Sequence, residues 1–173
     1  GEIYTTNTTN SAIFSNANST GGTITNNSGG QIYSSGSQAT LKAGATTTIT
    51  NSGSIKNNDD VDNNAIQLLG NNNTITLKNA GIVVGKITAD SGTTGNKLKF
   101  QHGFGQSYFY ETSGDFTLED LDGNQIVKGS AGSVGQGGNE THDELLGYKS
   151  LNIRKSLNRY KKNRNNLDEN KGR

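Results

Sequence analysis

Few residues of this 173-residue chain have the types and spacing that catalysis or metal binding requires. The two histidines, His102 and His142, lie far apart in the sequence and show none of the short spacings of zinc ligands. Cysteine is absent, and serine occurs in no G-x-S-x-G motif. The glycine-rich stretch 132–138 lacks the Lys-Ser/Thr pair of a phosphate-binding loop. We therefore predict no catalytic residue, no metal site and no cofactor, and expect that the chain is not an enzyme.

Two acidic segments contain the oxygen ligands that Ca²⁺ prefers. One holds Asp59, Asp60 and Asp62, and the other is Asp120-Leu121-Asp122-Gly123-Asn124. Neither has the twelve-residue frame of a calcium-binding loop. Either could hold Ca²⁺ weakly, but we favour plain acidic turns.

The composition of the chain limits how it can fold. Only 28% of residues are hydrophobic, the mean hydropathy is −0.73, and Gly, Asn, Thr and Ser dominate. Such a composition alone would suggest disorder. The few apolar residues, however, recur at regular intervals, which predicts an ordered repeat.

One phrase occurs three times: an apolar residue, a short polar step with Asn, a glycine and a second apolar residue. Its copies are ITNNSGGQI at 24–32, ITNSGSI at 49–55 and LKNAGI at 77–82. Aligning the glycines gives intervals of 24 and 28 residues, a length typical of a solenoid in which each coil stacks on the next. The predicted repeat residues are Ile24, Gly29, Ile32, Ile49, Asn51, Gly53, Ile55, Leu77, Asn79, Gly81 and Ile82.

Between residues 11 and 99 short alternating, β-branched segments are separated by Gly and Asn, which predicts strands. They could form an antiparallel sandwich or a parallel β-helix. The Asn-Gly and Asp-Gly hairpin turns of a sandwich are missing there, so we predict an all-β, parallel β-helix over 1–99. In it, side chains such as Asn79 would hydrogen-bond along the stack or serve as ordinary turn residues, and the glycines would turn corners with φ > 0.

Aromatic residues are concentrated directly after the repeats. The group consists of Phe100, Phe104, Tyr108, Phe109, Tyr110 and Phe116. They could form a platform that stacks sugars or host side chains, or they could cap the exposed last coil. We favour the cap, and extend it over 100–129 because Asp122-Gly123 predicts a two-residue hairpin turn with Leu118 facing Val127.

The C-terminal part differs in composition and charge. Residues 130–139 have the composition of a linker, and 140–173 are predicted to form a basic amphipathic helix and tail. Residues 149–173 contain 9 Lys and Arg against 2 Asp and Glu. This tail could contact anionic surfaces, but without a fold for base recognition we expect no sequence-specific nucleic acid, and prefer docking on another protein.

The ITNSGSI and LKNAGI phrases, the AIQL coil opening and the change after residue 100 to a hairpin and a linker helix resemble the C-terminal part of a bacterial autotransporter passenger, secreted by the type V route. The resemblance covers roughly residues 11–160. It implies a right-handed β-helix, an autochaperone-like cap, and a linker helix leading at 140–165 into the protein's own outer-membrane β-barrel. It also implies export through the periplasm and outer membrane to the cell surface or the medium.

Three functions follow as hypotheses. The first is binding, as an adhesin, host-receptor ligand or virulence factor that contacts a host-cell surface protein or glycan along a rigid rod. The second is a structural role as stalk and folding seed. The third is a polysaccharide-cleaving β-helix, which the lack of paired carboxylates in the repeat strands disfavours.

Overall fold

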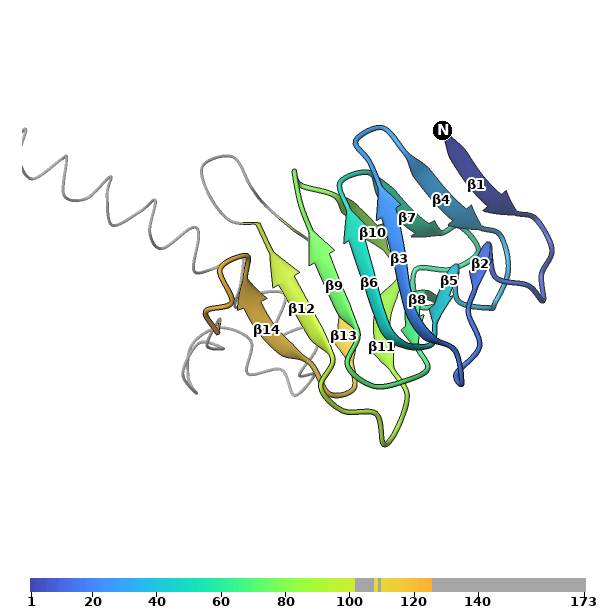
Figure 1. The fold of residues 1–173 in the computed structure, drawn as a ribbon. Coiled ribbons are helices and arrows are strands. Elements are labelled where there is room, and N and C mark those ends of the chain that lie inside the picture. The colour runs from blue at the N-terminus through green and yellow to red at the C-terminus, as the bar shows by residue number, and fades with distance from the viewer. Residues whose placement is uncertain (102–107, 109, 126–173) are drawn as a thin grey trace, which may run out of the picture. The chain divides into compact units, whose positions relative to one another are not determined.

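The computed structural model describes residues 1–101, 108 and 110–125. The chain divides into two units, Gly1–Val127 and Lys128–Arg173, and every described residue belongs to the first. The regular elements of this described part are all β-strands (Figure 1). The linker predicted at 130–139 and the helix predicted at 140–173 lie outside the described residues.

The strands form three sheets in which every pairing between strands is parallel. The first sheet consists of β1 (Glu2–Thr5), β4 (Gln31–Ser34), β7 (Ser54–Asn57) and β10 (Ile82–Val84). The second consists of β2 (Ile13–Phe14), β5 (Leu41–Ala43), β8 (Asn64–Leu68), β11 (Lys86–Ala89) and β13 (Thr112–Ser113). The third consists of β3 (Thr20–Asn26), β6 (Ala45–Asn51), β9 (Thr74–Leu77), β12 (Lys97–Phe100) and β14 (Thr117–Asp120).

As far as β12 the chain visits the three sheets in turn, so that each circuit adds one strand to each sheet; β13 and β14 then extend the second and third sheets. Figure 1 shows the third sheet as a row of arrows that point the same way, from β3 in blue to β14 in orange. The result is a β-solenoid of about four turns, which confirms the prediction of an all-β fold built from stacked parallel coils.

Apolar side chains that occupy the same register position in successive coils build the core. One column per sheet shows this arrangement: Ile32, Ile55 and Val83; Leu41, Ile66 and Ile87; Ile49, Ile75 and Leu98. All nine are at most 7% exposed. The alternating pattern of each strand therefore places one set of side chains inside the solenoid and the other outside.

The third copy of the repeat phrase is aligned differently from our prediction. Val83, and not Ile82, stands in register with Ile55, and Ile82 is 53% exposed. Leu77 occupies the register position of Asn51, so that Asn79 does not stack on Asn51. The reason is the corner between the strands, which runs from Leu77 to Val83 and is two residues longer than the corner from Asn51 to Ile55.

The glycines of the repeat also act differently from our prediction. Gly53 and Gly81 do not have a positive φ; among the three predicted glycines only Gly29 does, at 77°. Instead, a Cβ built on Gly53 would collide with the carbonyl oxygen of Gly30, and one on Gly81 with that of Asn51. Gly53 and Gly81 are required because neighbouring coils approach too closely for a side chain, and Gly30 takes the equivalent place in the first copy.

The turn after β14 is one residue longer than the predicted two-residue hairpin. The Asp120 amide donates to the Asn124 carbonyl at 2.9 Å, Gly123 has a φ of 86°, and Glu119 forms an antiparallel bridge with Gln125. Three residues therefore separate Asp120 from Asn124, because the glycine adopts the left-handed conformation at the third loop position. This bridge shifts the register by one residue from the predicted one, in which Leu118 faces Val127; Val127 itself lies outside the described residues.

Candidate binding surfaces

The residues that might have carried chemistry are not brought together. In the part of the chain that the structure describes, no group of three or more His, Cys, Asp or Glu side chains could hold a metal ion. His102 and His142 lie outside the described residues, as does the basic tail. The outer faces of the sheets and the loops between coils are therefore the surfaces to consider for function.

The acidic loop 57–64 is organised by its own polar side chains. The Asp62 amide donates to Asp60 Oδ1 at 2.9 Å, and Asn63 Nδ2 donates to Asp59 Oδ2 at 2.9 Å. Lys86 Nζ lies 3.5 Å from Asp62 Oδ1. The carboxylates of Asp59, Asp60 and Asp62 thus bond to groups of the loop itself and to Lys86, a pattern typical of an acidic turn.

Inside one corner, the predicted repeat residue Asn51 forms a short asparagine ladder with Asn26, which the prediction did not include. Asn26 Nδ2 donates to Asn51 Oδ1 at 2.8 Å, and the Gly53 amide donates to the same oxygen at 3.2 Å. Asn51 Nδ2 in turn donates to the Ile82 carbonyl at 3.0 Å. Both asparagine side chains are buried, at 6% and 0% exposure, so their polar atoms are satisfied by each other and by backbone groups of the corner.

A second ladder escaped the sequence analysis. Asn73 Nδ2 and the Asn73 amide donate to Asn96 Oδ1 at 3.1 and 3.0 Å, and the Thr47 amide donates to Asn73 Oδ1 at 2.7 Å. The signal was present, because each asparagine directly precedes a strand of the third sheet, in Asn73-Thr74 and Asn96-Lys97. The repeat copies were aligned by their glycines, and no glycine occupies the positions of Asn73 and Asn96, so this alignment did not include them.

Part of the predicted aromatic cap lies in the interior of the last coils. Phe100, Tyr108 and Tyr110 are at most 3% exposed, and the Phe100 ring centroid is 5.7 Å from that of Tyr108 and 4.8 Å from that of Tyr110. Burial raises the pKa of Tyr108, and a hydrogen bond with the Ala80 backbone partly offsets this rise. These three rings offer no open platform for a ligand. Phe116 is half-buried, and Phe104 and Phe109 lie outside the described residues.

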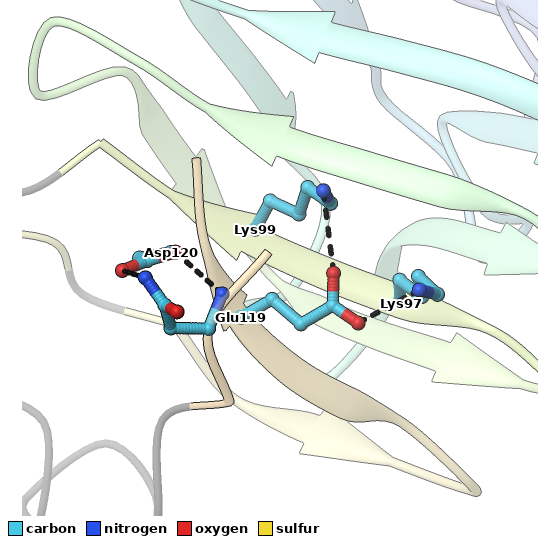
Figure 2. Close-up of polar contacts among 5 residues, drawn as sticks. Lys97, Lys99, Glu119 and Asp120 are labelled. Atoms are coloured by element: carbon cyan, nitrogen blue, oxygen red, sulfur yellow. Dashed lines mark hydrogen bonds and ion pairs between the residues drawn. The ribbon is translucent and has the colours of Figure 1, made fainter. Parts of the chain in front are cut away.

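On the outer face of the third sheet, a buried carboxylate joins the last two strands (Figure 2). Glu119 of β14 accepts a 2.8 Å hydrogen bond from Lys97 Nζ through Oε1, and its Oε2 forms an ion pair with Lys99 Nζ at 3.2 Å. Lys99 is the register partner of Glu119 on β12. The Lys97 hydrogen bond is the main cause that lowers the pKa of Glu119; burial opposes the shift and Lys99 adds to it.

Before that charged cluster, the same face presents threonines. The T-I-T triplets of β3, β6 and β9 stand in register, which forms two columns of outward side chains. We call these six residues the threonine array: Thr23, Thr48 and Thr74 in one column, Thr25, Thr50 and Thr76 in the other. Each column continues into a lysine, Lys97 and Lys99 respectively.

Comparisons of the chain with protein-family models, curated proteins and solved structures found no match. Among the described residues there is no helix long and apolar enough to cross a membrane. The features from which a function can be proposed are therefore the solenoid itself, its loops and its outer faces.

Proposed function

We propose that the chain is part of an autotransporter passenger that acts by binding, displayed on the bacterial surface or released from it. Two features support this proposal: the sequence phrases of such passengers, and the stacked coils on which they fall. A solenoid in which each coil is held by register pairing and internal asparagine ladders is a stiff support for contacts distributed along its length.

The finer parts of the proposal follow from the resemblance. The coil is right-handed, residues 100–129 act as an autochaperone-like cap, and 130–139 link it to a basic helix. That helix leads over residues 140–165 into the protein's own outer-membrane β-barrel.

Export can be tested by joining the full chain to a signal peptide and to an autotransporter β-barrel in a bacterial host. We expect protease added to intact cells to release a resistant fragment that ends within the linker predicted at 130–139, because the stacked coils protect their backbone. A barrel joined to its usual passenger is the control for assembly. Retention of the fusion in the periplasm, while the control is displayed, would contradict the proposal.

The partner in this proposal is a host-cell surface protein or glycan, contacted by loops 57–64 and 88–96 between coils. Val61 supports such a role for the first loop, because an apolar side chain stands 65% exposed among acidic residues at a loop position where nothing in the core requires it. Binding of the purified full chain to host cells should fall in Val61→Ser. It should persist in Leu121→Ser, which removes another exposed apolar side chain, 40% exposed, from a turn outside both loops. Equal binding by both variants would rule out this loop.

The buried aromatic cluster supports the second candidate, a stalk and folding seed. Replacing Phe100 with alanine should lower the free energy of unfolding by about 3–5 kcal/mol, because a fully buried ring is lost. Phe14→Ala, at a position that is 64% exposed, is the control and should have little effect. If the coils before residue 90 keep their protease resistance in Phe100→Ala, the cluster does not seed their folding.

A further inference from the structure

The hydroxyl groups of the threonine array are not engaged by the protein. Thr40, Thr47 and Thr93 donate their hydroxyls to backbone carbonyls, at 2.8, 3.4 and 2.7 Å. Within the described residues, none of the six array hydroxyls makes a hydrogen bond to another protein group. Thr23, Thr25 and Thr48 are exposed, Thr50 and Thr74 are partly covered, and Thr76, the register partner of Lys99, is buried at 8% exposure. The array thus presents free hydroxyls and methyl groups to solvent chiefly on β3 and β6, at Thr23, Thr25 and Thr48.

The solenoid holds these groups on a regular two-dimensional grid. Neighbouring strands lie about 4.8 Å apart, and residues i and i+2 of one strand about 6.7 Å apart. The register Thr23–Thr48–Thr74 continues without a shift, and so does Thr25–Thr50–Thr76. Because threonine is β-branched, its side chain is stiff, and the strands already fix the backbone. Little conformational entropy remains to be lost when the grid binds something.

A neutral grid of this kind is poorly suited to a small soluble ligand. A single hydroxyl contributes only about 0.5–1.5 kcal/mol net, and none of the six positions holds a charge or an aromatic ring that would select a solute. Affinity therefore needs many contacts at once, made to a partner that is itself rigid and periodic. The charged cluster of Lys97, Lys99 and Glu119 ends the neutral grid on the β12 side.

From this geometry we propose that the threonine array binds the surface of ice crystals. Oxygen atoms on faces of hexagonal ice repeat at spacings close to those of the grid, so that array hydroxyls can take lattice positions while methyl groups sit between them. A crystalline polysaccharide fits less well, because the apolar faces of sugar rings stack on aromatic side chains, which the array lacks. The stacked pair of exposed Tyr4 and half-buried Tyr33 lies on a different sheet. Ice binding requires only the solenoid, and no export or host partner.

The test uses the full chain and slowly growing polycrystalline ice. The wild-type protein should be enriched in the ice fraction and should inhibit recrystallisation, and Thr48→Lys should lose both properties. Lysine suits this column structurally, because Lys97 occupies it two strands further on. The matched control is Thr88→Lys in β11, which adds the same charge to the second sheet and should behave as wild type. If Thr48→Lys unfolds, Thr25→Lys at an exposed position replaces it.

Three results would overturn the inference. The wild-type protein could be excluded from ice as an ordinary solute is. Thr48→Lys could enter ice as well as the wild type does. The wild type could bind microcrystalline cellulose or chitin through Thr48 and remain excluded from ice, which would assign the grid to a glycan. Failure of host-cell binding leaves each of these readouts unaffected, so the two proposals can be judged separately.

Discussion

At the scale of single residues, polar side chains determine how closely the coils fit. Asn51 is fully buried and joins three backbone or side-chain groups of neighbouring segments. Glu119 is buried and forms ion pairs with two lysines of the preceding coil, Lys97 and Lys99. In a chain with so few apolar residues, loss of such a group leaves several partners unpaired at once.

Asn51→Ala should lower the free energy of unfolding by about 2–4 kcal/mol, because Asn26 Nδ2, the Gly53 amide and the Ile82 carbonyl each lose a buried partner. Denaturant unfolding measures the change. Asn58→Ala, at an exposed position, is the control and should stay within about 0.5 kcal/mol of wild type. Equal stability of the two variants would show that the ladder does not hold the corner.

Glu119→Gln should destabilise the protein at pH 7 by about 1–2 kcal/mol, because both lysines lose their counter-charge. The folded-state pKa of Glu119 is lowered, so its contribution is present above the unfolded pKa, near 4.5, and is lost as pH falls through the folded pKa. Thermal unfolding should therefore separate wild type and variant at pH 7, and the gap should narrow in acid.

The matched control is Asp122→Asn, which neutralises an exposed carboxylate of the next turn. It should change stability little at either pH. A gap between wild type and Glu119→Gln that stays constant from pH 7 into acid would contradict the role of the ionised carboxylate.

At the scale of elements, the strands could be predicted and the corners could not. Alternation identifies strands such as β6 (Ala45–Asn51), because side chains on a strand point to opposite faces with period two. Corner length has no such period: Gly53 and Gly81 look equivalent in sequence, yet their corners differ by two residues, which moves Ile82 outward and Val83 inward. The sequence also could not show that Gly53 and Gly81 allow a close approach of two coils. A positive φ and a contact too close for a side chain both require glycine, so the residue type does not distinguish them.

Gly53→Ala should destabilise the protein by about 1–3 kcal/mol, because the new methyl group would collide with the Gly30 carbonyl oxygen of the preceding coil. Gly22→Ala is the matched control: its φ is not positive, and an added Cβ would meet only the Thr47 side chain at an ordinary distance of 3.6 Å. Thermal melting compares the two. A larger loss in Gly22→Ala would contradict the assignment of Gly53 as a contact glycine.

At the scale of the whole described unit, the account depends on parallel coils stacked in one register. The threonine array, the asparagine ladders and the Glu119 cluster all arise from it, because each joins residues about one coil apart in sequence. The sequence indicated stacking through its repeat length, but the register itself follows from the corners. The register between adjacent coils is therefore the feature to measure.

Cross-linking is the most direct test, because the chain contains no cysteine of its own. Thr48→Cys with Thr74→Cys places two thiols on register partners of adjacent strands, about 4.8 Å apart at Cα and within reach of a disulfide. Thr48→Cys with Thr117→Cys, in the same column but three strands apart, is the control at about 14 Å. We predict an intramolecular disulfide under mild oxidation in the first pair and none in the second. Equal cross-linking of both pairs, or none in the first, would contradict the stacked register.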